Sequence, residues 1–121
     1  MKKLAASSLT ADQQEFFKTH LAYLATVDQN GLPQVGPKQS MQVLDANHLQ
    51  YLEKTKAHAY ANLKNGSKAA VVVADKPDHT NVRVIGSAEI HENDAYAQKV
   101  LGTNSDSDPY VVVITIEEID A

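Results

Sequence analysis

The sequence contains no cysteine, which excludes disulfides, thiolate nucleophiles, iron–sulfur clusters and cysteine-ligated zinc sites together. Arginine is nearly absent as well, since Arg83 is the single arginine among eleven basic residues. The formal net charge is −4, whereas a nucleic-acid-binding chain usually carries a broad basic face. We therefore expect no nucleic-acid partner.

Long apolar runs are also missing. No stretch is long enough to cross a bilayer, and the opening "MKKLAASSL" has two lysines without an apolar segment behind them. The sequence therefore predicts a cytoplasmic protein without a membrane partner. With 121 residues, of which 43% are hydrophobic and 21% charged, the composition is typical of one globular domain over residues 1–121.

The common catalytic signatures do not occur. There is no phosphate-binding P-loop, no dinucleotide-binding G-x-G-x-x-G and no G-x-S-x-G of the hydrolases. The segment "HENDA" (91–95) begins like the zinc-binding H-E-x-x-H, but it ends on alanine. The five histidines show no pairing at helical spacing, so we expect no metal site. We also expect no catalytic side chain; if the protein is an enzyme, a cofactor supplies the reactivity.

What the sequence does contain is a pattern of short apolar segments separated by turn residues. This pattern predicts a mainly β fold with six antiparallel strands and three helices. The expected strands cover residues 21–27, 32–45, 49–54, 68–75, 81–91 and 110–119, and the expected helices follow Thr10 and cover residues 56–65 and 92–102.

Particular residues mark the ends and breaks of these elements. Thr10 and Gln13 form a capping-box pattern, and Thr55 is the expected N-cap of the second helix, which Gly66 is expected to end. Asn30-Gly31 is expected to form a turn, since it allows a positive φ. Gly36-Pro37 is expected to interrupt the second strand, since proline cannot donate to a ladder, and Gly86 is expected to form a bulge.

Two predicted strands, "AVVVA" (70–74) and "YVVVITI" (110–116), are apolar without alternation. In an antiparallel sheet this pattern means that both faces of the strand are covered. A barrel of this size has one interior, so the second face needs a helix or another subunit. We take the pattern as a sign of a homodimer, while the helices could provide part of the cover.

A basic stretch stands out in this acidic chain. After Glu53, the segment up to Lys68 carries Lys54, Lys56, Lys64 and Lys68 without a further acidic residue. Thr55 adds a hydroxyl donor, and His58 falls in the first turn of the predicted helix, where positive charge normally disfavours a helix. A bound phosphate would reverse that penalty. The alternative is a solvated lysine-rich surface on which His58 stays neutral.

The second polar cluster is "VGPKQSMQV" (35–43). Lys38, Gln39 and Ser40 follow the expected strand interruption and can offer donors to the edge of a planar ligand. A flavin needs such contacts at its pyrimidine end, where negative charge accumulates on reduction, and a cation such as Lys38 would raise the reduction potential. The alternative is an edge-strand lysine that prevents aggregation.

The order of these features resembles a known family. The segments "ATVDQNGLPQVGP", "NLKNGSKAAVVV" and "IGSAEI" are similar to those of the FMN-binding split barrels related to pyridoxamine 5′-phosphate oxidase, in particular their small stand-alone members. The resemblance covers roughly residues 20–116 and implies a six-stranded antiparallel Greek-key split barrel that is a homodimer, with FMN at the subunit interface.

The resemblance also implies a set of site residues. The flavin ring would meet Pro37, Lys38, Gln39 and Ser40, and the phosphate would be held by Lys54, Thr55, Lys56 and His58. The Asn of the family's "N-L" pair falls on Asn62, which the resemblance implies as a further cofactor-binding residue. The arginine-rich second strand and the C-terminal substrate segment of true pyridoxamine 5′-phosphate oxidases are absent. Oxidation of pyridoxamine 5′-phosphate itself is therefore not expected.

Three functional hypotheses follow. The leading one is an oxidoreductase that passes electrons through non-covalently bound FMN to a partner that the sequence does not identify. The second keeps the barrel for another anionic ligand, namely a deazaflavin, haem with His58 or His91 as its axial ligand, or a small molecule that is sensed. The third is a dimeric interaction module whose basic helix is simply solvated.

Overall fold

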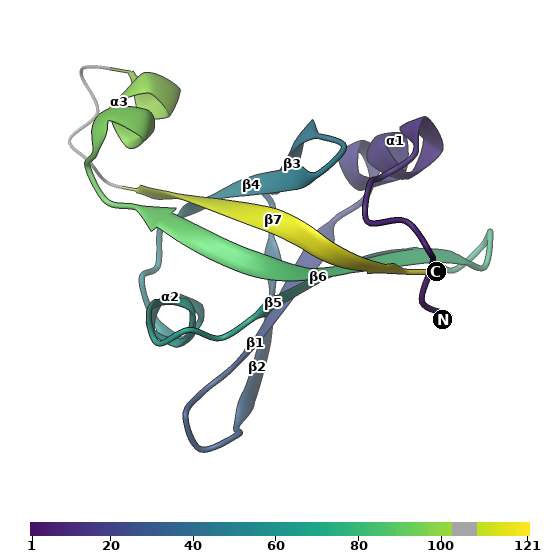
Figure 1. Ribbon diagram of the computed structural model, residues 1–121, viewed down its shortest axis with the longest axis horizontal. Helices are drawn as coiled ribbons and strands as arrows, with labels where there is room; N and C mark the ends of the chain where they lie inside the picture. The colour runs from purple at the N-terminus through teal and green to yellow at the C-terminus, as the bar shows by residue number, and fades with distance from the viewer. Residues whose placement is uncertain (103–108) are drawn as a thin grey trace.

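The computed structural model describes residues 1–102 and 109–121, which form one antiparallel sheet with three short helices around it (Figure 1). The helices are α1 (Ala11–Thr19), α2 (His58–Lys64) and α3 (Ala95–Leu101). The strands are β1 (Ala22–Val27), β2 (Pro33–Lys38), β3 (Gln42–Asp45), β4 (His48–Glu53), β5 (Ala69–Asp75), β6 (Thr80–His91) and β7 (Tyr110–Asp120). The longest described helix has nine residues, so none in this part of the chain could cross a membrane.

The strands pair in the order β2-β1-β5-β6-β7-β4-β3, and every pairing is antiparallel. The two edge strands, β2 and β3, are consecutive in the chain and are joined by residues 39–41. The four Cα–Cα steps from Lys38 to Gln42 span at most about 14 Å, so the end of one edge strand lies close to the start of the other. The sheet therefore curls into a barrel that stays split between β2 and β3, and the split-barrel fold that the family resemblance implies is confirmed.

The number of strands differs from the prediction, because the expected strand over residues 32–45 is two strands. The break does not lie at Gly36-Pro37, which β2 passes through while Pro37 pairs with Tyr23 of β1. Since β2 is an edge strand, the missing N–H of Pro37 costs no ladder bond. The chain turns instead at Gln39-Ser40, where the Met41 N–H donates to the Lys38 carbonyl (3.0 Å).

The barrel interior is filled by residues that alternate along the strands. Leu49 and Tyr51 of β4, Val71 of β5, Val84 of β6 and Ile114 of β7 are fully buried. The predicted bulge is confirmed, because the register of β6 against β7 shifts between Ile85 and Gly86. The interior of the barrel thus provides the rigid frame for the groups at its open end.

Two of the predicted caps are confirmed and one is wrong. Thr10 and Gln13 form a complete capping box at the start of α1, and Gly66, with φ +93°, follows the C-cap Asn65 of α2. Thr55, in contrast, does not cap α2. Lys56 adopts a positive φ of 53°, so the helix begins only at His58, with Ala57 as an N-cap residue that provides no side-chain hydrogen bond.

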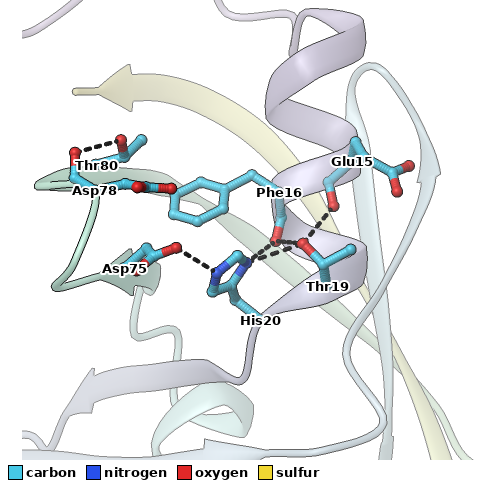
Figure 2. Close-up of polar contacts among 7 residues, drawn as sticks. All are labelled: Glu15, Phe16, Thr19, His20, Asp75, Asp78 and Thr80. Atoms are coloured by element: carbon cyan, nitrogen blue, oxygen red, sulfur yellow. Dashed lines mark hydrogen bonds and ion pairs between the residues drawn. The ribbon is translucent and has the colours of Figure 1, made fainter.

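The first helix is fastened to the sheet through His20, the residue that follows α1 (Figure 2). Its Nδ1 lies 2.9 Å from Thr19 Oγ1 and 3.2 Å from the carbonyl oxygen of Phe16, while its Nε2 lies 3.2 Å from Asp75 Oδ2 at the end of β5. The Phe16 and His20 rings also meet edge to face, with centroids 4.4 Å apart. These contacts hold α1 against the end of β5, and the helix also contacts β3.

The doubly apolar strands are covered in different ways. Val111 and Val112 of β7 are both fully buried, although they point to opposite faces, and α3 packs on this strand with Ala97 buried. On β5, Ala70 and Val72 stay partly exposed on the outer face. A helix therefore covers β7, which agrees with the alternative that helices provide part of the cover.

An apolar surface lies on the outside of the β1–β2 hairpin. Tyr23 is 43% exposed, Val27 42% and Val35 72%. Tyr23 lies opposite Pro37 of β2 on one side and opposite Val72 of β5 on the other, so these side chains share one face of the sheet. We call the set Tyr23, Val27, Val35, Pro37 and Val72 the outer apolar face.

Candidate functional site

Two adjoining cavities lie where β2, β4 and the start of α2 meet. The inner cavity, of about 200 Å³, lies between the β1–β2 hairpin and the segment from Glu53 to Ala59; its walls include Thr26, Gly36, Lys38, Glu53, Thr55 and His58. The junction cavity, also of about 200 Å³, lies at the turn between β2 and β3; its walls include Pro37, Lys38, Gln39, Ser40, Lys54 and Thr55. Lys38 and Thr55 line both cavities.

Most of the predicted site residues line these two cavities. The predicted ring segment, residues 37–40, and three members of the predicted phosphate segment, Lys54, Thr55 and His58, come together there. The split of the barrel accounts for this meeting, because the turn after β2 lies next to the end of β4. Ser40 fixes the junction, since its hydroxyl accepts a hydrogen bond from the Leu52 N–H (3.0 Å).

Lys56 and Asn62 do not line either cavity. The Lys56 N–H donates to Glu53 Oε2 (3.0 Å), and its ammonium lies over the Tyr110 ring, 4.0 Å from the centroid. Asn62 is 5% exposed and donates from Nδ2 to Thr26 Oγ1 (3.0 Å), and Thr26 lines the inner cavity. Asn62 therefore supports the wall of the site from behind.

Glu53 is a cavity residue that the sequence reasoning missed. It is 1% exposed, and its Oε1 lies 3.6 Å from Lys38 Nζ and accepts a hydrogen bond from the Tyr51 hydroxyl (3.3 Å). Burial, with the nearby Glu53 carboxylate, raises the pKa of Tyr51, so its phenol stays a neutral donor. A signal existed in "LQYLE" (49–53), where an acid occupies the position of an inward-facing residue after Leu49 and Tyr51.

The site combines a concave shape with donors and with little negative charge other than Glu53. Each cavity is smaller than the roughly 300–1,000 Å³ of most small-molecule sites, and together they reach that range. Lys38 and Lys54 provide ammonium groups, Thr55 provides a hydroxyl and His58 an imidazole. This set fits an elongated ligand with a polar planar part and an anionic end.

A third cavity, of about 350 Å³, lies beside the junction cavity and shares Ser40 and Leu52 with it. It lies between the β3–β4 hairpin and α3, and its walls include Gln42, Gln50, Val100 and Leu101. Among the described residues no charged side chain lines it, so these residues offer no anchor for an anion. His91, the other histidine considered as a haem ligand, lines none of these three cavities. Its Nδ1 lies 2.7 Å from Asp94 Oδ2 instead.

Comparison with known proteins identifies the family. A sequence model described as pyridoxamine 5′-phosphate oxidase matches residues 9–121, nearly the whole chain. The chain belongs to the pyridoxamine 5′-phosphate oxidase family. No curated protein matches it.

Solved structures of this family include close relatives. A Lactobacillus delbrueckii protein named as a candidate pyridoxamine 5′-phosphate oxidase is 58% identical, covers 100% of both chains and superposes with a TM-score of 0.95. HupZ of Group A Streptococcus is 31% identical, covering 92% of this chain and 91% of its own, with a TM-score of 0.79.

Two structures below 25% identity share the fold alone. One is named F420 reductase (24% identity, 84% of this chain and 89% of that chain, TM-score 0.66). The other is an FMN-binding protein from Syntrophomonas wolfei (18% identity, 82% of this chain and 74% of that chain, TM-score 0.65). Proteins that share this fold are thus named for two different ligands, F420 and FMN.

Proposed function

We propose that the protein is a flavoprotein that holds FMN non-covalently in the inner and junction cavities and passes electrons through it as an oxidoreductase. The observation that supports this most directly is that Lys38 and Thr55 line both cavities. The segment proposed for the ring and the segment proposed for the phosphate are thereby parts of one site. Family membership and the FMN-binding protein of the same fold support the choice of ligand.

The chain's own residues would divide the work of binding. Lys54, Thr55 and His58 would hold the phosphate through charge-assisted hydrogen bonds. Residues 37–40 would meet the polar edge of the ring, and Lys38 would stabilise negative charge there. FMN, when bound, would supply the electron-transfer chemistry that the side chains lack.

We propose further that the site is completed by a second copy of the chain packed on the outer apolar face. This face lies on the same hairpin as the inner cavity, and Val35 borders the cavity itself. Contiguous exposed apolar surface of this kind marks association sites. A homodimer would cover it and would enlarge a cavity that one chain provides only in part.

Ligand titration tests the proposal. Adding FMN to purified protein is expected to give a shifted flavin absorbance band and quenched fluorescence, and riboflavin, which lacks the phosphate, is expected to bind more weakly. A colourless protein that leaves the fluorescence of added FMN unchanged would rule the flavin function out.

Light scattering tests the dimer. Val35→Asp is expected to give monomers, while Leu44→Asp, an equally polar change at an exposed site on β3, is the matched control.

A deazaflavin is the second candidate ligand, because a protein of the same fold is named F420 reductase. Titration with FMN and with a deazaflavin under identical conditions separates the two. Tighter binding of the deazaflavin would replace FMN as the assignment, and a Soret band in the purified protein would point to haem instead.

A further inference from the structure

Glu53 is the buried charged group of the inner cavity. It ends β4, where "LQYLE" places Leu49, Tyr51 and Glu53 on the inward face, and it ranks with the largest fully buried side chains. A buried carboxylate is costly unless it is paired and hydrogen-bonded. Its partners therefore show what the position is built to do.

Three groups converge on this carboxylate. The Tyr51 hydroxyl donates to Oε1 (3.3 Å), the Lys56 N–H donates to Oε2 (3.0 Å), and Lys38 Nζ lies 3.6 Å from Oε1. The first two hold the carboxylate in place from the barrel and from the loop before α2. The third comes from the edge strand and lines both cavities, with 17% of its side chain exposed.

This pairing changes what a ligand meets at Lys38. A lone ammonium near a ring that becomes negative on reduction would bind the reduced form more tightly than the oxidised form. A carboxylate 3.6 Å from the ammonium acts on the same ring with the opposite sign, and water screens the two charges only weakly because both side chains are largely buried. The pair therefore presents a dipole to the ligand in place of a net positive charge.

We propose that Glu53 is a positioning residue that sets the charge of the flavin site. It holds Lys38 in the cavity wall and offsets the charge of the ammonium. The reduced flavin therefore binds less tightly than it would if Lys38 stood without a carboxylate partner. This inference rests on the proposed function. It assigns to the buried pair the control of the balance between oxidised and reduced ligand.

A pair that only stabilises the fold would behave differently. Removing either partner of a buried ion pair leaves the other charge uncompensated, so both single variants are expected to melt at lower temperature. If Glu53 sets the charge of the site, the ratio of the dissociation constants for oxidised and reduced riboflavin is instead expected to change in one direction when Glu53 is neutralised and in the other direction when Lys38 is neutralised. Riboflavin is the probe because it carries no phosphate, so the basic residues at 54–58 contribute little to the ratio.

The experiment compares Glu53→Gln, Lys38→Met and the double variant with the wild type. E53Q is expected to tighten the reduced form relative to the oxidised form about tenfold, which raises the two-electron potential by about 30 mV. K38M is expected to shift the ratio the opposite way, and the double variant is expected to fall between the two. Glu53→Asp, which keeps the charge, is expected to stay close to the wild type.

Asp120 provides the matched control. It is also buried, and its Oδ2 lies 3.0 Å from both Nε and Nη2 of Arg83, at the opposite end of β7 from the residue that pairs with Glu53. Asp120→Asn is expected to lower the melting temperature and to leave the ratio unchanged. A shift in D120N as large as in E53Q would show that the ratio reports general loosening, and would overturn the inference.

The outcomes separate the two proposals. If the wild type binds riboflavin and the ratio is the same in E53Q and K38M, or moves in the same direction in both, Glu53 does not set the site's charge while the flavin function stands. If no protein binds either riboflavin or FMN, both proposals fail. Should E53Q not fold, the opposite shift in K38M and the wild-type behaviour of E53D still decide the question.

Discussion

Asn62 and Thr26 form a buried hydrogen bond that joins α2 to β1 across 36 residues of sequence, with Nδ2 donating to Oγ1 over 3.0 Å. Both side chains are 5% exposed, and Thr26 faces the inner cavity. The bond therefore fixes the helix that follows the proposed phosphate segment against the strand that forms the opposite wall.

Removing this bond is expected to destabilise the protein. In Asn62→Ala the Thr26 hydroxyl loses its buried donor, which is expected to lower the free energy of unfolding by about 1–3 kcal/mol. Urea denaturation measures this change. In the double variant Asn62→Ala/Thr26→Val no orphaned hydroxyl is left, so its loss is expected to be smaller than the sum of the two single losses. Additive losses would mean that the two side chains act independently.

Two glycines are expected to respond differently to alanine. A Cβ on Gly86 would lie 2.0 Å from the carbonyl oxygen of Thr115, whereas a Cβ on Gly36 meets nothing within 4 Å. Gly86→Ala is expected to lose about 3 kcal/mol or more of unfolding free energy, because the bulge backbone must shift. Gly36→Ala is expected to keep its stability and, since Gly36 lines the inner cavity, to weaken FMN binding. Equal stability of both variants would contradict the bulge geometry.

His58 is expected to contribute to FMN affinity through the phosphate. It lines the inner cavity, where its imidazole can donate a hydrogen bond to an anion. His58→Ala is therefore expected to weaken FMN binding and to leave riboflavin binding unchanged, which fluorescence titration measures. His58→Gln keeps a donor and is expected to retain part of the affinity. A wild-type FMN affinity in H58A would remove His58 from this role.

Lys54 is expected to matter for the ligand and little for the fold. Its side chain is exposed, and exposed charges contribute roughly 0–1 kcal/mol to stability. Lys54→Ala is therefore expected to unfold like the wild type, to bind FMN more weakly and to bind riboflavin unchanged. Lys76→Ala, a change at an exposed lysine in the turn between β5 and β6, is the control. A wild-type FMN affinity in K54A would argue against a phosphate at this position.

Tyr51 is expected to limit stability at alkaline pH. Burial raises the pKa of Tyr51 in the folded protein, while an unfolded tyrosine titrates near pH 10. The neutral phenol therefore contributes stability that is fully present below about pH 10 and falls above it by about 1.4 kcal/mol per pH unit. Urea denaturation of the wild type and Tyr51→Phe at several alkaline pH values measures this slope.

In Tyr51→Phe this part of the alkaline loss is expected to disappear. Tyr23→Phe changes an exposed tyrosine of the outer apolar face and is expected to retain it. If Y51F and Y23F lose stability equally above pH 10, which is roughly where free tyrosine ionises, burial of the Tyr51 phenol is not the cause.

Local sequence signals predicted the elements well where the cause is local. The capping box of Thr10 and Gln13, the turn at Asn30-Gly31 and the helix end at Gly66 depend on neighbouring residues, and each occurs where it was expected. The two errors concern residues whose behaviour depends on where the strands lie in the sheet and on the path of the backbone after β4. Pro37 stays in a strand because β2 is an edge, and Thr55 does not cap α2 because the backbone turns at Lys56, whose N–H donates to Glu53.

The site shows the same division. The sequence alone determined which segments are polar and basic, since Lys38, Lys54 and His58 can be read directly. It did not show that Glu53 is buried against Lys38, because an acid on an inward-facing position becomes meaningful only when its partners from β2 and β4 are known.

The sequence by itself determined the antiparallel β fold, most element boundaries and the family, because alternation, turn residues and family motifs are properties of consecutive residues. Only the tertiary structure decided that β2 and β3 are separate edge strands, that the two polar segments share Lys38 and Thr55, and that the cation at their centre is paired with a buried carboxylate. The physical reason is that closure of the barrel and burial of Glu53 depend on long-range strand pairing, which no short window of sequence contains.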